Sequence, residues 1–146
     1  MNKIKIIGAG LAGSEAALQL ADKGWQVHLY EMRGKKQTPA HQTDLCAELV
    51  CSNSLKSKLP STSSGLLKAE NNLLGCKLLY LAEQASVDAG NALAVDRELF
   101  SQIVTQKIKS HPNIQYINEE VCYLDDELTI LATGPLSSDN ITAELL

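Results

Sequence analysis

The residues best suited to chemistry are a cysteine in a polar stretch and a glycine-rich turn near the N-terminus. Cys51 follows the short apolar piece Leu45 to Val50 and precedes Ser52-Asn-Ser54. A thiolate is a strong nucleophile, so a cysteine here could add to an electrophilic carbon. The alternative is a packing residue, because unpaired cysteines are often buried among apolar neighbours. The residues beside Cys51 leave both roles open.

The glycine-rich turn has the spacing of a dinucleotide-binding motif and comprises Gly8, Ala9, Gly10, Leu11, Ala12 and Gly13. In such a motif Gly8 permits a tight turn, Gly10 lets the backbone approach a pyrophosphate, and Gly13 lets the next helix pack against the preceding strand. The N-terminus of that helix offers free N–H groups and a positive dipole end to the phosphates. A glycine-rich turn without a ligand is the alternative.

The segments on either side of this turn have the order of a nucleotide-binding βαβ unit. A strand over Lys3 to Ile7 leads into the turn, a helix over Ser14 to Lys23 follows, and a strand over Gln26 to Tyr30 ends at Glu31. A carboxylate at this point can accept hydrogen bonds from the adenosine ribose hydroxyls. Glu31 therefore favours a nucleotide with a free 2′-hydroxyl, FAD or NAD, over NADP.

Beyond this unit, an irregular stretch over 32–62 is followed by alternating helical and extended patterns. An irregular stretch of that length is usually functional or disordered. Apolar periodicity and capping residues predict helices over 65–74, 78–85 and 97–109 and strands over 114–117, 120–124 and 128–132. This alternation predicts the α/β class with a doubly wound parallel sheet.

Composition indicates a globular chain with one sizeable core. The 146 residues are 45% hydrophobic and 21% charged, and the net charge is −4. That charge argues against a nucleic-acid-binding surface, yet residues 32–77 hold seven basic and three acidic side chains, a local surplus of +4 around Cys51. The surplus predicts either an anionic ligand near Cys51 or a solvated loop region.

The cysteines, the histidines and the first residues bear on metal binding and location. Cysteine and histidine spacing fits no structural zinc site, so we expect no metal. The apolar run Ile4 to Ile7 is too short for a signal peptide or a membrane helix. We therefore expect a cytoplasmic protein with reduced thiols and no membrane partner.

Several segments together resemble the folate- and FAD-dependent tRNA (uracil-5-)-methyltransferase family. They are Ile6–Ala17, Tyr30–Arg33, Thr38–His41, Ala47–Leu55, Gly65–Lys68, Ala92–Arg97 and Ala132–Pro135. The segment around Cys51 is the most specific of them, since generic flavoproteins do not share it. The resemblance implies a glutathione-reductase-like FAD-binding fold of Rossmann type. It also implies one-carbon transfer from methylenetetrahydrofolate to C5 of a uridine in the tRNA T-loop, with NADH or NADPH reducing the flavin.

The same resemblance implies roles for individual residues. Cys51 would be catalytic, either in handling the one-carbon unit beside the flavin or in attack on the pyrimidine. The backbone of Val121 would contact adenine, and Thr133 and Gly134 would form a second flavin-contacting segment. Arg33 would reach the phosphates or the RNA, with a solvated loop arginine as the alternative. The other thiols are interpreted as buried packing residues: Cys46, Cys76 and Cys122.

Members of that family are longer chains, which bears on domain organisation. We expect residues 1–146 to form the N-terminal FAD-binding domain, with 32–90 as an active-site insertion. A second catalytic cysteine and most of the RNA-facing surface would then lie outside this sequence. Three alternatives stay open: a non-catalytic FAD-binding fragment, a methyltransferase of the same family acting on rRNA, and a generic FAD oxidoreductase.

Overall fold

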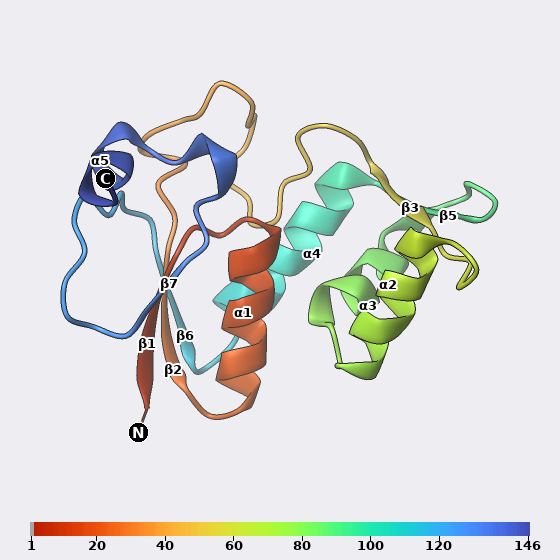
Figure 1. Ribbon diagram of the computed structural model, residues 1–146, viewed down its shortest axis with the longest axis horizontal. Helices are drawn as coiled ribbons and strands as arrows, with labels where there is room; N and C mark the ends of the chain where they lie inside the picture. The colour runs from red at the N-terminus through yellow and green to blue at the C-terminus, as the bar shows by residue number, and fades with distance from the viewer. Residues whose placement is uncertain (1) are drawn as a thin grey trace.

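The computed structural model describes residues 2–146 and has two lobes (Figure 1). The larger lobe contains β1 (Lys3–Ile7), α1 (Leu11–Asp22), β2 (Gln26–Tyr30), α4 (Arg97–Lys109), β6 (Ile114–Ile117), β7 (Thr129–Leu131), η1 (Gly134–Leu136) and α5 (Asp139–Glu144). The smaller lobe contains β3 (Ser54–Ser57), α2 (Ser63–Leu73), α3 (Lys77–Gln84), β4 (Ser86–Val87) and β5 (Ala92–Val95). The chain passes to the smaller lobe just before β3 and returns to the larger lobe along α4 (Figure 1).

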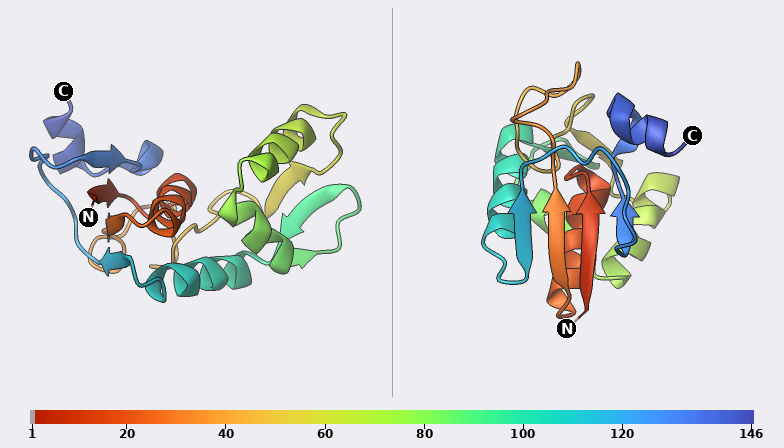
Figure 2. Two further views of the ribbon diagram at one scale, coloured as in Figure 1. Left: turned by 90° about the horizontal axis from the view of Figure 1, so that it is seen from below. Right: turned by 90° about the vertical axis from the view of Figure 1, so that its left-hand side faces the viewer.

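A four-stranded parallel sheet in the order β6-β2-β1-β7 forms the centre of the larger lobe. The helices α1 and α4 lie on one face of this sheet (Figure 2). They pack against the inward-facing side chains of β1 and β2, namely Ile4, Ile6, Val27 and Leu29, which are at most 5% exposed. The predicted α/β class with a parallel, Rossmann-type sheet is confirmed.

The opposite face of the sheet carries Lys5, a charged side chain that is only 7% exposed. Its ammonium group pairs with Asp125 and lies 3.5 Å from Glu127 Oε2. The Lys5 backbone N–H also donates to the carbonyl of Leu128 at 3.0 Å. These contacts hold the connection between β6 and β7 against the sheet, since a buried ammonium group needs its carboxylate partners.

The carboxyl ends of the parallel strands meet at one edge of the sheet. Gly8 follows β1, Glu31 follows β2, Asn118 follows β6 and Ala132 follows β7. The N–H of Gly8 donates to the carbonyl of Tyr30 at 2.8 Å. In open α/β sheets, ligands bind at this edge. The glycine-rich turn and Glu31 therefore lie where the topology places a nucleotide.

The smaller lobe is tied to the larger one through a helix cap. Glu15 of α1 accepts the backbone N–H groups of Lys77 and Leu78, at 2.9 and 2.8 Å, and so caps the N-terminus of α3 from another helix. Within the smaller lobe, α2 packs tightly at Gly65. A Cβ there would lie 1.8 Å from the carbonyl oxygen of Leu59, so this contact requires glycine.

The structure confirms some predicted elements and corrects others. The helix over 97–109 and the strand over 114–117 have the predicted bounds. The predicted strand over 120–124 is wrong: this segment crosses the carboxyl edge of the sheet instead of running beside a strand (Figure 2). Its side chains turn to other partners, and Glu120 pairs with Lys36 at 2.8 Å.

The small antiparallel sheet β3-β5-β4 was not predicted. All three of its strands fall outside the predicted elements: β3 lies in the irregular stretch, β4 directly follows the helix predicted over 78–85, and β5 directly precedes Asp96. β3 and β5 are each four residues long, and β4 has two residues. Strands this short carry too few side chains for a recognisable alternation.

Candidate functional site

A cleft of about 260 Å³ opens at the carboxyl edge of the parallel sheet. It is lined by most of the residues that the sequence predicted for a cofactor site, namely Gly8, Gly10, Leu11, Ala12, Glu31, Arg33, Val121, Thr133 and Gly134. Ala9 and Gly13 lie behind this lining, and both are buried. The fold thus gathers segments from both ends of the chain around one cavity.

Each of the three positions in the turn is occupied by glycine for a different physical reason. Gly8 has a φ of +101°, and a Cβ there would lie 2.5 Å from the carbonyl oxygen of Ala132. At Gly13 a Cβ would lie 1.8 Å from the carbonyl oxygen of Gly8. Gly8 and Gly13 are therefore required by the fold itself.

Gly10 differs from its neighbours because the protein does not require a glycine there. Its φ of −69° suits any residue, and a Cβ would meet nothing within 4 Å. The position lines the cleft. Open space in front of a glycine backbone fits a ligand that approaches closely, as a pyrophosphate does in this motif.

The N-terminus of α1 points its free backbone donors at the same cleft. No side chain caps this helix, and its first turn contains no acidic residue. Ala9, just before it, is already satisfied: its N–H donates to Glu31 Oε2 at 2.8 Å and its carbonyl accepts from Ala47 N at 2.8 Å. The uncapped donors that follow fit an anionic group, which the helix dipole also favours.

Glu31 lies buried at the floor of the cleft and is paired with Arg33. Arg33 Nη2 donates to Glu31 Oε2 at 3.0 Å, and the Arg33 backbone N–H donates to Oε1 at 3.0 Å. Burial raises the pKa of Glu31, but the hydrogen bonds and charge of Arg33 outweigh it and hold that pKa below 4.5. Glu31 is therefore ionised at neutral pH and able to accept hydrogen bonds.

Arg33 is 2% exposed, so the alternative of a solvated loop arginine is wrong. Its other guanidinium nitrogen, Nη1, lies 3.5 Å from Glu48 Oε2. Glu48 in turn accepts from the backbone N–H groups of Gln42 and Thr43, at 2.8 and 3.1 Å. Arg33 thereby links the acid at the floor of the cleft to the loop over 38–50.

This loop is also held at its other end. The N–H of Ala47 donates to the carbonyl of Ala9, and the N–H of Cys46 donates to Thr105 Oγ1 at 2.8 Å. Ala47 has a φ of +54°, which is unusual for a residue with a side chain. Such a conformation persists where surrounding contacts impose it. The loop is therefore a fixed wall of the cleft.

The opposite wall comes from the C-terminal part of the chain. Thr133 and Gly134 follow β7, and Thr133 Oγ1 lies 2.6 Å from Ser137 Oγ. Ile141 of α5 is 2% exposed and faces the cleft. Val121 lines the cleft from the segment that was wrongly predicted as a strand. Its role as the adenine contact stays a prediction.

The four thiols have different environments. Cys51 is exposed and directly follows Val50, which lines the cleft. Cys46 is fully buried, and burial raises the pKa of its thiol to about 11, in agreement with a packing role. Cys76 is half-buried beside Glu15, 3.4 Å from Oε2. Cys122 is exposed, so its interpretation as a buried residue is wrong.

Thr38, His41 and Glu48 line the cleft although the sequence assigned them no role. The first two belong to the Thr38–His41 segment that carried the family resemblance, and this was the available signal. Glu48 belongs to the Ala47–Leu55 segment of the same resemblance, but its contact with Arg33 depends on the folded loop.

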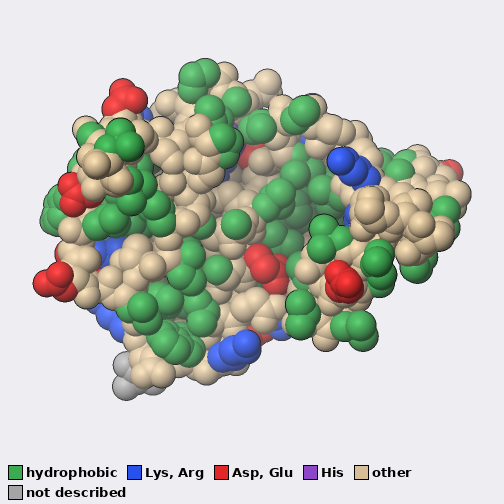
Figure 3. Space-filling model, viewed as in Figure 1, with side chains coloured by type: hydrophobic (Ala, Val, Ile, Leu, Met, Phe, Trp, Pro, Cys, Tyr) green, Lys and Arg blue, Asp and Glu red, His purple; other side chains and the backbone are tan. Residues whose placement is uncertain are grey.

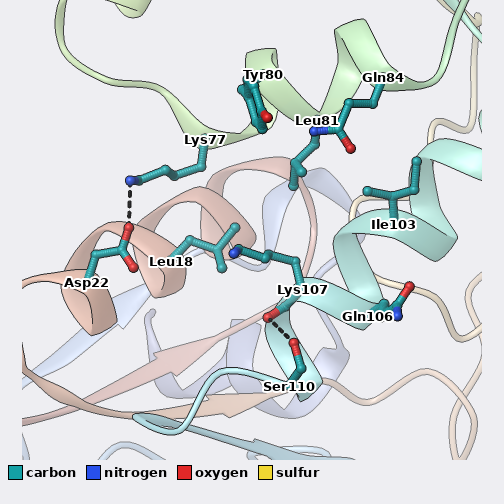
Figure 4. Close-up of a pocket in the computed structure, with 10 residues that line it drawn as sticks. All are labelled: Leu18, Asp22, Lys77, Tyr80, Leu81, Gln84, Ile103, Gln106, Lys107 and Ser110. Carbon is teal, nitrogen blue, oxygen red and sulfur yellow. Dashed lines mark hydrogen bonds and ion pairs between the residues drawn. The ribbon is translucent and has the colours of Figure 1, made fainter.

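A second, larger cleft of about 500 Å³ lies between α1, α3 and α4 (Figure 4). Leu18, Leu81 and Ile103 supply apolar side chains to it. Its carboxylate, Asp22, already pairs with Lys77 and with His111. With that carboxylate engaged and no glycine backbone in its lining, this cleft is not the candidate site.

The surface shows a hollow between the lobes, with apolar side chains inside it, basic groups at its upper right and acidic groups at its lower edge (Figure 3). Within residues 32–77, the basic side chains that form ion pairs in the described structure are Arg33, Lys35, Lys36 and Lys77. Across residues 2–146 no ion pair involves Lys56, Lys58 or Lys68. The basic side chains near Cys51 that form no ion pair therefore lie on the smaller lobe.

Within residues 2–146, no helix is both long and apolar enough to cross a membrane. No group of three or more His, Cys, Asp or Glu side chains in this part of the chain could hold a metal ion.

Residues 3–144 match the family model of glucose inhibited division protein A, GIDA. The chain belongs to the GIDA family. Among solved structures, it resembles Aquifex aeolicus GidA with a TM-score of 0.67 and 16% identity, covering 86% of this chain and 21% of that one. At this identity the likeness shows the fold alone.

Among curated relatives, this GIDA-family chain resembles proteins named methylenetetrahydrofolate–tRNA-(uracil-5-)-methyltransferase TrmFO. It is 55% identical to the Bacillus subtilis protein over 142 residues and 58% identical to the Acholeplasma laidlawii protein over 143 residues. Each match covers 97% of this chain, but 33% and 34% of the relatives. The chain thus spans about a third of the length of these curated relatives, and the resemblance predicted from the sequence is confirmed.

Acidification is expected to destabilise the fold through the cleft residues. The pKa of Glu31 and that of Glu48 lie below 4.5, so their stabilising contribution is complete above that pH and is lost as the pH falls through the lowered values. Burial and Arg33 lower the pKa of His41 below 6.5, so the unfolded chain takes up this proton first. Urea denaturation at pH 7.5, 5.5 and 4.0 should show falling stability at each step. Equal stability at all three values would contradict this linkage.

Proposed function

We propose that this chain is the FAD-binding part of a folate-dependent tRNA (uracil-5-)-methyltransferase. The observation that carries the proposal is the open space in front of Gly10 at an uncapped helix N-terminus, in one cleft with an ionised Glu31. This combination fits a dinucleotide with a free ribose 2′-hydroxyl. The relatives named TrmFO support the methyltransferase assignment.

The residues of the cleft suit separate parts of such a dinucleotide. The turn from Gly8 to Gly13 would hold the pyrophosphate, and Glu31 would accept hydrogen bonds from the ribose. Val121 would lie at the adenine, and Thr133 with Gly134 would contact the flavin portion. Bound FAD would supply the electron transfer that converts a one-carbon unit to a methyl group. Arg33 would position Glu31 and not contact the dinucleotide itself, since its Nη2 pairs with Glu31 and its Nη1 pairs with Glu48.

Cys51 would perform the nucleophilic part of the reaction. C5 of uracil becomes a carbon nucleophile once a thiolate adds at C6, and expulsion of the thiolate with loss of the C5 proton restores the ring. The exposed position of Cys51, next to the cleft residue Val50, suits access by a large RNA substrate. The unpaired Lys56 and Lys58 would attract the phosphate backbone.

The remaining assignments extend the same proposal. The carbon donor would be methylenetetrahydrofolate, the reductant of the flavin NADH or NADPH, the substrate a uridine of the tRNA T-loop, and the location the cytoplasm. Residues 32–90 would form an active-site insertion of an N-terminal FAD-binding domain. The rRNA alternative keeps the same cleft and differs only in the RNA.

Two measurements test the proposal. Titration of this chain with FAD, followed by flavin fluorescence, should show saturable binding. A chimera in which the chain replaces the matching third of the Bacillus subtilis relative should form 5-methyluridine in a tRNA transcript supplied with methylenetetrahydrofolate and NADH or NADPH. A chain that binds no FAD would refute the cofactor assignment. A chimera that binds FAD but methylates rRNA alone would favour the rRNA alternative.

Glu31→Gln is expected to weaken binding of FAD and of ADP-ribose by about 1–3 kcal/mol, the cost of losing a hydrogen bond to a charged acceptor. It should also lower stability, because Arg33 would keep only Glu48 as its carboxylate. Isothermal titration well below the unfolding temperature separates the two effects. Glu15→Gln, on α1 outside the cleft, should leave both affinities unchanged. Equal affinity in the Glu31 variant would assign the ribose to another group.

A further inference from the structure

His41 is an unassigned ionisable side chain in the wall of the cleft. Its ring is fixed, with Nδ1 2.6 Å from Thr38 Oγ1. Its backbone N–H also donates to this hydroxyl oxygen, at 3.2 Å. The loop that carries both residues is held by Glu48 and Ala47, so the ring has a defined position relative to the glycine-rich turn.

The free atom of this ring is Nε2. It makes no hydrogen bond within residues 2–146. Nε2 is also accessible to solvent. Within residues 2–146, the buried side-chain polar atom that lacks a hydrogen-bond partner is Ser101 Oγ, so Nε2, which also lacks a partner, is not a buried atom. Since Thr38 Oγ1 accepts the backbone N–H, its proton can be donated to Nδ1, and the proton of the neutral ring then lies on Nε2. In this tautomer Nε2–H is a free hydrogen-bond donor on a side chain that lines the cleft.

The charged groups around His41 indicate which part of the cleft it lies in. Arg33, Glu48 and Glu31 are the ionised groups that act on it. Burial and Arg33 lower the pKa of the imidazole, while the two carboxylates raise it. All three groups belong to the end of the cleft at Glu31, where the ribose and phosphates of a dinucleotide would lie.

We propose that His41 is a cofactor-binding residue whose Nε2–H donates a hydrogen bond to a phosphate oxygen of the ADP half of the bound dinucleotide. The assignment rests on the proposed function, because it assumes a dinucleotide in this cleft. His41 lines the same cleft as Gly10, Leu11 and Ala12 at the N-terminus of α1, so a donor from the loop would add to the backbone donors of that helix.

This contact makes binding dependent on pH. A phosphate near Nε2 stabilises the protonated imidazole, so the pKa of His41 rises when the ligand binds. Because the complex then binds protons more tightly than the free protein, affinity increases as the pH falls from 8 to 6. The diester pyrophosphate of ADP-ribose suits this measurement, whereas the terminal phosphate of ADP would itself titrate near pH 6.

The experiment measures the wild-type chain first. Histidine ¹⁵N NMR of His41, free and saturated with ADP-ribose, should show a raised pKa in the complex. Affinity for ADP-ribose should increase roughly threefold to tenfold from pH 8 to pH 6. Riboflavin, which carries no ADP half, should leave the His41 titration unchanged.

Variants then test the hydrogen bond itself. His41→Phe should weaken ADP-ribose and FAD binding about tenfold to a hundredfold and remove the pH dependence. His41→Gln, whose amide nitrogen can occupy the position of Nε2, should retain most of the affinity but lose the pH dependence. His28→Phe, a matched change on β2 outside the cleft, should behave as wild type.

The outcomes separate the two proposals. If the wild-type chain binds neither FAD nor ADP-ribose, the proposed function is refuted, and the role proposed for His41 is refuted as well. If both bind while His41 titrates unchanged and His41→Phe binds equally well, the role of His41 alone is refuted. A His41 titration that responds to riboflavin and not to ADP-ribose would overturn the assignment to the ADP half.

Discussion

Cys51→Ala is expected to abolish 5-methyluridine formation while leaving FAD bound. The sulfur atom is the proposed nucleophile, and alanine cannot add to C6 of uracil, so the rate should fall on the order of a thousandfold or more. FAD binding should persist because Cys51 is exposed and does not line the cleft. Stability should also hold, since truncating an exposed side chain creates no cavity.

The chimera with the Bacillus subtilis relative allows the measurement, with 5-methyluridine quantified by nucleoside mass spectrometry. Cys122→Ala is the matched control, because Cys122 is the other exposed thiol of this chain. Cys46→Ala should remain active, although removing a fully buried sulfur lowers stability. Normal methylation by the Cys51→Ala chimera would leave Cys51 without a catalytic role.

Gly10→Val is expected to remove dinucleotide binding without unfolding the protein. The valine side chain would occupy the open space in front of the uncapped N-terminus of α1, where the pyrophosphate would lie. Affinity for FAD should fall on the order of a hundredfold or more, about 3 kcal/mol. The backbone at Gly10 is extended, with a φ of −69°, so valine adds no strain.

Gly13→Val supplies the contrast to this variant. Its Cβ would overlap the carbonyl of Gly8, so α1 would have to move away from β1 and the fold should lose stability. Thermal unfolding and FAD titration of both variants distinguish the two roles. A Gly10→Val protein with wild-type FAD affinity would show that the pyrophosphate does not lie at this turn.

Some of these features could be read from the sequence because short-range patterns specify them. Asp96 caps α4, and its side chain accepts the N–H of Leu99 at 3.0 Å, as the sequence predicts for a helix over 97–109. The order of strand, glycines, helix, strand and acid likewise determined the cleft at Gly10 and Glu31. These signals lie within a few residues of the element that they specify.

The tertiary structure alone decided how the walls of the cleft are assembled. Local sequence patterns do not show that Arg33 would be buried between Glu31 and Glu48, or that the loop over 38–50 would be held as a wall of the same cavity. It also suggested a strand at 120–124, where the chain instead crosses the sheet edge. Burial and charge pairing depend on segments far apart in the chain, and local periodicity carries no information about those contacts.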